Sequence, residues 1–391
     1  MLTLIKNGEV YAPHYLGKKD LLIVGNKIGF MEDKIEKPSD FVDVEVIDAS
    51  DKLVVPGFID AHVHIIGGGG EGSYKTRTPE MHLTDASLAG VTTVVGVIGT
   101  DGTTRTMPAL IAKARALEEE GITCYVHTGS YQVPVKTLTG KIEDDLILID
   151  KIIGAGEIAI ADHRSSQPTL EELAKIASAA RIGGMLSGKA GIVNIHVGDG
   201  EDRLDLIETV VEKTAIPLRQ FYPTHINRNP QLFEAGIQFA KKGGYVDFTT
   251  SSIPKFQKEG EVKSSIALRR MLEADVDISR ITFTSDAQGS LPDFDSSGEL
   301  IGLKIGKISS LFAEIRDSIQ KEQVPIELAL RVITQNPAEI LKLKQKGVIE
   351  AGRDADLVLL RKDDLLIDTV IAMGQVLVEK GEAIVKGTFE A

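Results

Sequence analysis

Short apolar runs rich in β-branched residues alternate with longer segments through the middle of the chain. Eight of these runs have the length and composition of buried strands, at 58–64, 91–97, 123–127, 157–161, 192–197, 220–225, 245–249 and 281–286. Between and after them, apolar residues recur at helical spacing in 79–89, 105–120, 144–154, 170–182, 202–213, 230–242, 263–274 and 304–320. Strands that alternate with helices form parallel sheets. Eight units in roughly 265 residues predict a (β/α)8 barrel, and an open doubly wound sheet is the alternative.

The two ends of the chain have a different pattern. The first 55 and the last 40 residues consist of short alternating runs separated by turn signals, among them the dipeptides Asn7-Gly8 and Gly25-Asn26. Neither end has the pattern of a complete domain, so we predict that both contribute strands to one small β-sandwich. The predicted parts of the chain are residues 1–55 of the sandwich, a barrel at 56–346 and residues 347–391 of the sandwich.

Composition excludes several classes of partner. The 391 residues carry a formal net charge of −13, which disfavours nucleic acids and anionic membrane surfaces because both select basic proteins. No apolar run approaches the length of a membrane span, and the first residues lack the apolar core of a signal peptide. Cys124 is the single cysteine, so an internal disulfide is impossible. These features predict a cytoplasmic protein.

Imidazoles and carboxylates gather at the predicted strands. His62 and His64 stand two residues apart on the first strand, so both side chains point to the same side. The other members of this set are Glu157 on the fourth strand, His196 on the fifth, His225 on the sixth and Asp286 on the eighth. In a barrel these positions converge on one mouth. Such ligands suit zinc and similar divalent ions, and their number indicates two metal ions that share a carboxylate and a water.

The motif PGFIDAHVH, followed by eight units with a histidine on strand six and an aspartate on strand eight, resembles the amidohydrolase superfamily. Finer motifs are similar to those of the isoaspartyl (β-aspartyl) dipeptidase family. They are GGGGEG, VIGTDGTTR, HTGSYQVP, ADHRSSQPT, NIHVGDG, PTHINRN and TSDAQGS, and the similarity extends over nearly the whole chain. The resemblance implies a metallo-dipeptidase that hydrolyses β-aspartyl dipeptides through a hydroxide bridging two metal ions, expected to be Zn²⁺. It also implies a homo-oligomer, an octamer in relatives.

The resemblance further implies roles for single residues. His62, His64 and Asp286 would hold one metal ion, and His196 and His225 the other. Asp286 would accept a proton from the attacking water and pass it to the leaving amine.

The same resemblance implies a substrate site. Glu71 would pair with the free α-amino group of the substrate, and Arg164 and Arg228 would bind its carboxylates. Tyr131 would donate to the oxyanion. The hydroxyls of Thr100 and Ser290 would bind near the aspartyl end. One anion and two cations match the one ammonium and two carboxylates of a β-aspartyl dipeptide, and arginine suits carboxylates.

One position departs from the family pattern. The family has a carbamylated lysine as bridging ligand on strand four, whereas alignment on the ADHR motif places Glu157 there. Lys151 lies six residues earlier, in the predicted preceding helix, and is a poor substitute. Glutamate keeps the negative charge, but its carboxyl carbon is three bonds from Cα instead of six. We predict that Glu157 is a metal ligand and that the metal centre forms without bicarbonate.

Two alternatives remain open at this stage. A cyclic amidase such as a dihydroorotase or hydantoinase, or an N-acyl amino-acid deacetylase, would keep the fold, but its substrate offers no ammonium for Glu71. A non-catalytic scaffold barrel would have lost its metal site. The intact ligand set argues against that reading, and the glutamate at position 157 is its only support.

Overall fold

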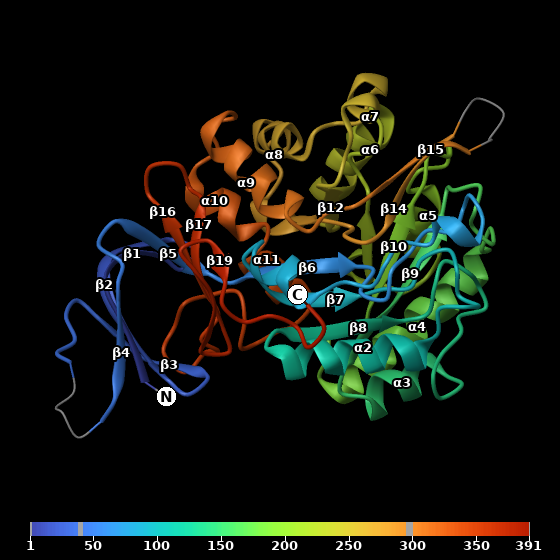
Figure 1. The fold of residues 1–391 in the computed structure, drawn as a ribbon. Helices are drawn as coiled ribbons and strands as arrows, with labels where there is room; N and C mark the ends of the chain where they lie inside the picture. The colour runs from blue at the N-terminus through green and yellow to red at the C-terminus, as the bar shows by residue number, and fades with distance from the viewer. Residues whose placement is uncertain (1, 38–41, 295–299, 391) are drawn as a thin grey trace.

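The computed structural model describes residues 2–37, 42–294 and 300–390. A barrel of parallel strands with outer helices occupies one side of the molecule, and a sheet built from both ends of the chain occupies the other (Figure 1). None of the helices within these ranges has the length and apolar character that crossing a bilayer requires.

The barrel strands are short, apolar and almost fully buried, as parallel strands covered by helices must be. They are β6 (Phe58–Val63), β7 (Val91–Gly96), β8 (Thr123–Thr128), β9 (Ile152–Ile160), β10 (Ile192–Val197), β11 (Phe221–Thr224), β12 (Val246–Thr249) and β13 (Ile281–Thr284). Strands β6 to β11 form one parallel sheet in chain order, and β12 pairs with β13. The Ile226 amide donates to the Asp247 carbonyl at 3.1 Å, and the His64 amide donates to the Ala287 carbonyl at 2.9 Å. These links join β11 to β12 and β13 to β6, which confirms the barrel and excludes the open sheet.

Local sequence signals explain where several helices begin. The helices are α1 (Leu83–Ser87), α2 (Met107–Glu120), α3 (Ile142–Leu148), α4 (Leu170–Ser187), α5 (Asp205–Lys213), α6 (Pro230–Lys241), α7 (Pro254–Glu259), α8 (Ser264–Glu273), α9 (Ser310–Gln320), α10 (Ile326–Arg331) and α11 (Gln335–Ile340). Thr106 caps α2, Asn229 caps α6, and Thr169 with Glu172 forms a capping box at α4. Three single-turn 3₁₀ helices, η1 (Tyr74–Thr76), η2 (Leu218–Gln220) and η3 (Ile278–Arg280), lie in the connections.

Several predicted element boundaries are wrong. Strand β9 begins at Ile152, so Glu157 lies within the strand and not at its start, and Lys151 lies outside α3. Helix α9 begins at Ser310 because 290–294 and 300–305 form an antiparallel hairpin, β14 (Ser290–Phe294) and β15 (Leu300–Ile305). Strands β11 and β13 end before His225 and Asp286, which adopt φ angles of 66° and 53°.

The prediction that both termini contribute strands to one β-structure is confirmed: these strands form one sheet where a small β-sandwich was expected. Its members are β1 (Leu2–Tyr11), β2 (Tyr15–Val24), β3 (Lys27–Glu32), β4 (Val44–Asp48), β5 (Lys52–Pro56), β16 (Leu357–Arg361), β17 (Ile367–Ala372), β18 (Gln375–Glu379) and β19 (Glu382–Ala383). They make a single hydrogen-bonded sheet of nine strands, in which β5 pairs with β16 and so joins the two ends of the chain. A separate apolar core that includes Ile5, Leu21 and Leu357 packs within it. The Asn7-Gly8 pair is not a turn but an irregularity within β1. The limits of the barrel at residues 56–346, and of the terminal parts at 1–55 and 347–391, stay a prediction.

Candidate metal centre and active site

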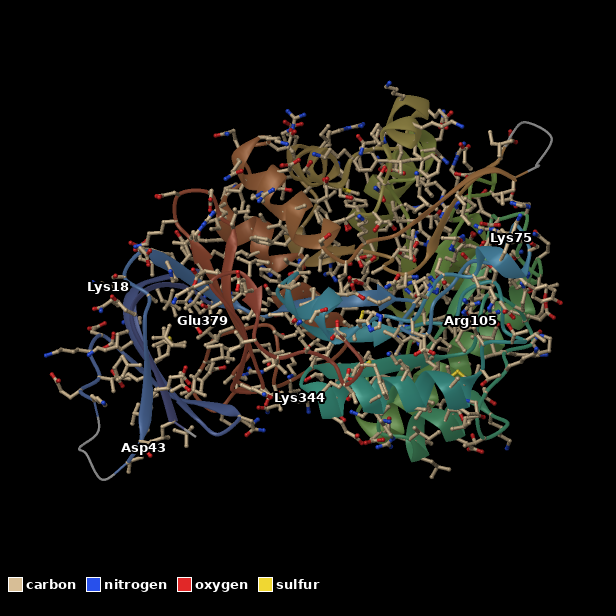
Figure 2. All side chains as sticks on the ribbon, in the orientation of Figure 1. Lys18, Asp43, Lys75, Arg105, Lys344 and Glu379 are labelled. Carbon is tan, nitrogen blue, oxygen red and sulfur yellow. The ribbon has the colours of Figure 1, made fainter. Side chains whose placement is uncertain are left out.

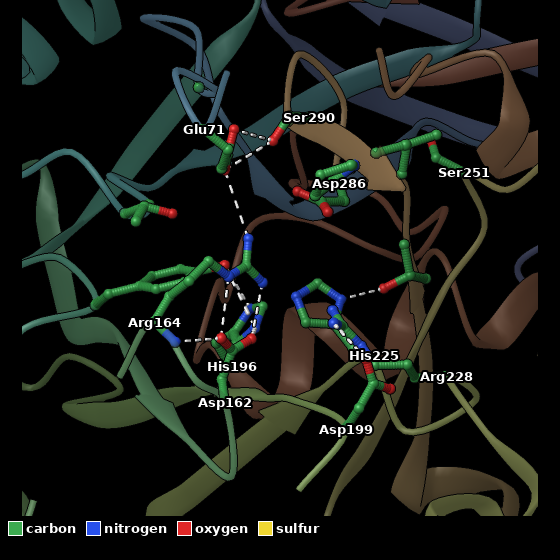
Figure 3. A pocket seen from close by; sticks show the side chains of 18 of the residues that line it. Glu71, Asp162, Arg164, His196, Asp199, His225, Arg228, Ser251, Asp286 and Ser290 are labelled. Atoms are coloured by element: carbon green, nitrogen blue, oxygen red, sulfur yellow. Dashed lines mark hydrogen bonds and ion pairs between the residues drawn. The ribbon is translucent and has the colours of Figure 1, made fainter. Parts of the chain in front are cut away.

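The carboxyl ends of the barrel strands surround a cavity of about 590 Å³ (Figure 3). Apart from His62 and Glu157, every residue that the sequence predicts for the site lines this cavity. These residues are His64, Glu71, Thr100, Tyr131, Arg164, His196, His225, Arg228, Asp286 and Ser290. His62 and Glu157 are fully buried in the barrel. The structure therefore gathers the whole predicted set at one end of the barrel.

Strand β6 and the turn after β13 form the first ligand group. His62, His64 and Asp286 have ligand atoms within 4.8 Å of one another. The His64 Nε2 atom lies 3.0 Å from Asp286 Oδ1, and His62 Nε2 lies 3.7 Å from the same oxygen. Gly99 packs against this group, because a Cβ there would come within 2.8 Å of the His64 ring.

Glu157 lies between the histidines of the two predicted metal ions. Its Oε2 atom is 3.3 Å from His62 Nε2, 3.4 Å from His196 Nδ1 and 3.9 Å from His225 Nε2. Its Oε1 atom is 3.5 Å from His64 Nε2. His62, Glu157 and His225 form the second group with ligand atoms within 4.8 Å. A carboxylate in this position reaches all four imidazoles, which is the arrangement that a shared ligand requires.

Unpaired buried atoms support a metal site. His62 Nε2, both carboxylate oxygens of Glu157 and Asp286 Oδ1 are buried without a hydrogen-bond partner among the described residues. Buried polar atoms are nearly always satisfied, and imidazole nitrogen facing carboxylate oxygen is a common donor set for divalent metals. The residues present therefore fit metal ions.

The second ring nitrogens of the histidines are held by neighbouring side chains. His62 Nδ1 lies 3.1 Å from Asn194 Oδ1, His225 Nδ1 lies 2.5 Å from Thr249 Oγ1, and His196 Nε2 lies 2.8 Å from Asp162 Oδ2. Such partners set the tautomer and orientation of a ligating imidazole. Sequence reasoning missed all three. Asn194 precedes His196 by two residues on β10, so both side chains point to the same side of the strand. This spacing was the available sequence signal for Asn194.

Electrostatics at the site favour a bound cation. Burial opposes a charge on His62, yet the carboxylate of Glu157 raises the pKa of His62 to about 10. Burial also opposes ionisation of Glu157 and Asp286, but the neighbouring histidines lower the pKa of both carboxyl groups. The carboxylates are therefore ionised and attract positive charge.

Among the described residues, no lysine lines the cavity. Lys151 lies just before the start of β9, six residues from Glu157, where its ammonium pairs with Glu118 and lies 5.5 Å from the Tyr125 ring centre. A carbamylated lysine therefore has no place here.

The predicted substrate side chains face the cavity from several loops (Figure 3). Both Glu71 carboxylate oxygens lie 3.0 Å from Ser290 Oγ, and Arg164 Nη1 lies 3.5 Å from Glu71 Oε1. Arg164 donates to both oxygens of Asp162, whereas the nearest carboxylate to Arg228 is that of Asp199 at 3.8 Å. Charged groups of both signs thus flank the candidate metal centre.

The glycine-rich loop that carries Glu71 packs tightly against its own chain. Gly67 has a φ of 74°, and a Cβ there would come within 2.3 Å of the Thr78 carbonyl oxygen. The buried side chain of Arg105 (Figure 2) donates to the carbonyls of Ile66 at 3.2 Å and Gly68 at 2.6 Å. The glycines therefore permit this loop packing. Arg105, which sequence reasoning did not identify, fixes the loop in place.

The sequence model of the amidohydrolase family matches residues 53–377. The chain belongs to the amidohydrolase family. This amidohydrolase is 45% identical to the β-aspartyl dipeptidase of Fervidobacterium islandicum AW-1 in a structure with the dipeptide β-Asp-Leu, with 98% of each chain covered and a TM-score of 0.91. A second structure of that enzyme has 43% identity and a TM-score of 0.89. The resemblance to isoaspartyl dipeptidases and the expectation of a hydrolase are confirmed.

Other relatives are more distant. The dihydroorotase of Lactobacillus gasseri is 24% identical over an alignment that covers 91% of this chain and 88% of that enzyme. The dihydroorotase of Staphylococcus epidermidis is 32% identical over 162 residues, which span only 35% of its length. A D-hydantoinase structure with 17% identity and a TM-score of 0.68 shares the fold.

Proposed function

We propose that this amidohydrolase hydrolyses β-aspartyl dipeptides with two divalent metal ions, zinc being the expected element. The observation that carries the proposal is Glu71, a carboxylate that lines the same cavity as the histidine cluster and the cations Arg164 and Arg228. A β-aspartyl dipeptide presents one ammonium and two carboxylates, so this set complements its charges. The similarity to an enzyme crystallised with β-Asp-Leu supports the same substrate class.

The first proposed ligand set coincides with one group of the cluster, and His196 joins the second set through its Nδ1 atom, 3.4 Å from Glu157 Oε2. His62, His64 and Asp286 would hold one ion, His196 and His225 the other, with Glu157 shared between them. Bound divalent metals lower the pKa of a water ligand toward neutrality, which makes a hydroxide nucleophile available at physiological pH. Because Glu157 is itself a carboxylate, we propose that the centre assembles without bicarbonate.

Asp286 is the proposed proton carrier. Its carboxylate lines the cavity, and its Oδ1 atom lies 3.0 Å from His64 Nε2. As the hydroxide oxygen bonds to the side-chain amide carbon, its remaining proton moves to this carboxylate. Asp286 then delivers the proton to the amide nitrogen as the carbon–nitrogen bond breaks, so the leaving residue departs as a neutral amine.

Tyr131 is the proposed oxyanion donor. Burial raises the pKa of Tyr131 well above its usual value, and nearby Glu157 acts in the same direction. The hydroxyl therefore keeps its proton and is able to donate it in a hydrogen bond to the developing oxyanion. Its position near the cluster, with the hydroxyl 2.8 Å from His196 Nδ1, supports this role.

The remaining polar residues would bind the rest of the substrate. Glu71 would receive the α-ammonium group, with Ser290 beside it at 3.0 Å, and Thr100 would add a hydrogen bond at the aspartyl end. Arg164 and Arg228 would bind the carboxylates. We further propose that the protein acts in the cytoplasm, as a homo-oligomer with the octameric assembly of its family, and divides into a barrel at 56–346 and a terminal β-domain.

A substrate panel tests the proposal. Zinc-loaded protein is assayed with β-Asp-Leu, with its N-acetylated form and with dihydroorotate. We expect cleavage of β-Asp-Leu only, because acetylation removes the ammonium that Glu71 would bind. Preferential turnover of dihydroorotate or of the acetylated dipeptide would favour the cyclic amidase or deacetylase alternatives.

A further inference from the structure

One buried carboxylate links two side chains that have separate roles in the proposed function. Asp162 follows β9 in the connection to α4, and its side chain is 3% exposed. Its Oδ2 atom accepts from His196 Nε2 at 2.8 Å and from Arg164 Nη2 at 2.7 Å. Its Oδ1 atom accepts from Arg164 Nε at 3.0 Å and from the Arg164 amide at 2.8 Å. Both oxygens are therefore fully engaged.

The bond to His196 determines which ring nitrogen keeps a lone pair. A carboxylate only accepts, so His196 must carry a proton on Nε2, and in a neutral imidazole the other nitrogen then has a lone pair. That nitrogen, Nδ1, lies 3.4 Å from Glu157 Oε2 in the metal cluster. Carboxylates that hold the second nitrogen of a histidine in this way orient it for metal binding.

The bonds to Arg164 determine which edge of its guanidinium faces the cavity. Asp162 takes Nε and Nη2 in a two-pronged contact, so these donors are occupied. The remaining nitrogen, Nη1, points toward Glu71, 3.5 Å from its Oε1 atom. The guanidinium lies 5.5 Å from the Tyr131 ring centre, and the Tyr131 hydroxyl returns to His196 Nδ1 at 2.8 Å. Figure 3 shows Asp162 between Arg164 and His196, with Arg164 extending toward Glu71.

We propose that Asp162 is a positioning residue that sets both the metal-binding nitrogen of His196 and the substrate-facing edge of Arg164. Both halves of this inference rest on the proposed function: the metal half on His196 as a metal ligand, and the substrate half on Arg164 as a substrate-binding residue. Substitution of this one side chain should therefore weaken metal binding and substrate binding together.

Asp162→Asn tests the inference. The amide keeps the size of the side chain but turns one acceptor into a donor, which then faces the donor groups of His196 or Arg164. The matched control is Asp145→Asn on α3, another buried carboxylate, which accepts from Thr128 Oγ1 at 2.5 Å and from the Leu138 amide at 2.9 Å. This control loses a comparable number of hydrogen bonds away from the cavity.

Zinc affinity is measured by competition with a chromophoric chelator, alongside KM and kcat for β-Asp-Leu and the melting temperature. We expect Asp162→Asn to weaken one of two zinc sites by about 10- to 100-fold and to raise KM. We expect Asp145→Asn to change the melting temperature alone. Unchanged zinc affinity and KM in Asp162→Asn, or equal zinc loss in the control, would overturn the inference. If the wild-type protein cleaves no β-Asp-Leu, the proposed function fails while the zinc titration still tests the role of Asp162.

Discussion

Replacement of Glu157 tests the metal centre at its most distinctive residue. Glu157→Gln preserves the shape of the side chain and removes its negative charge. In the wild-type protein the two oxygens lie between 3.3 and 3.9 Å from nitrogens of four histidines. An amide offers one neutral oxygen, and its NH₂ group cannot act as a metal ligand. Removing one partner of a buried charge pair costs about 3–5 kcal/mol, which corresponds to roughly 100- to 4,000-fold weaker metal binding.

The assay is a zinc titration of the wild-type and variant proteins against a chelator, with metal content determined after gel filtration. Glu118→Gln is the matched control, because Glu118 pairs with Lys151 at the opposite end of β9. We expect the control to bind zinc as the wild-type protein does. Glu157→Lys adds a second arm, since a lysine there should bind metal only after bicarbonate is supplied. Two zinc ions bound to Glu157→Gln with wild-type affinity would refute the assignment of Glu157 as a ligand.

Three further predictions address substrate binding, catalysis and stability. Glu71→Gln should raise KM for β-Asp-Leu roughly 10- to 140-fold, the value of a hydrogen bond to a charged group, and a KM within twofold of wild type would contradict the role of Glu71. Tyr131→Phe should lower kcat by about 10²–10³ at unchanged zinc content; an effect confined to KM would oppose an oxyanion role. Burial raises the pKa of the Glu261 carboxyl group to about 7. The folded protein therefore binds the carboxyl proton more tightly than the unfolded chain does. The stability that this proton contributes is lost as the pH rises from about 4 to 7. The melting temperature of Glu261→Gln should therefore exceed that of the wild-type protein by a margin that grows as the pH rises over this interval. Glu259→Gln, at an exposed position, is the control. A difference in melting temperature that does not change with pH would contradict this reasoning.

The barrel and its mouth were predictable from sequence because both depend on simple periodicities. Apolar runs separated by helical spacing predict parallel strands, and polar residues at the ends of those strands predict a common site. Strand β9 was placed too late because Gly154 and Gly156 interrupt its apolar run and are typical of loops. The hairpin of β14 and β15 was missed because residues 290–299 are mostly polar and residues 300–305 lack a clear alternation.

The partners of the histidines were harder to predict. Asn194, Thr249 and Asp162 each contact one imidazole through a single hydrogen bond, and each such pair is separated by 24 to 132 residues in the chain. Only the folded barrel brings them together. Arg105 likewise acts on the glycine-rich loop through carbonyl groups 37 and 39 residues away, which no local pattern indicates.

The most direct test compares β-Asp-Leu with α-Asp-Leu as substrates of the zinc-loaded protein, in buffer depleted of carbon dioxide. We predict hydrolysis of the β isomer alone, without added bicarbonate, because Glu157 would supply the shared carboxylate. No hydrolysis of the β isomer by protein carrying two zinc ions, or hydrolysis only after bicarbonate is added, would contradict this prediction.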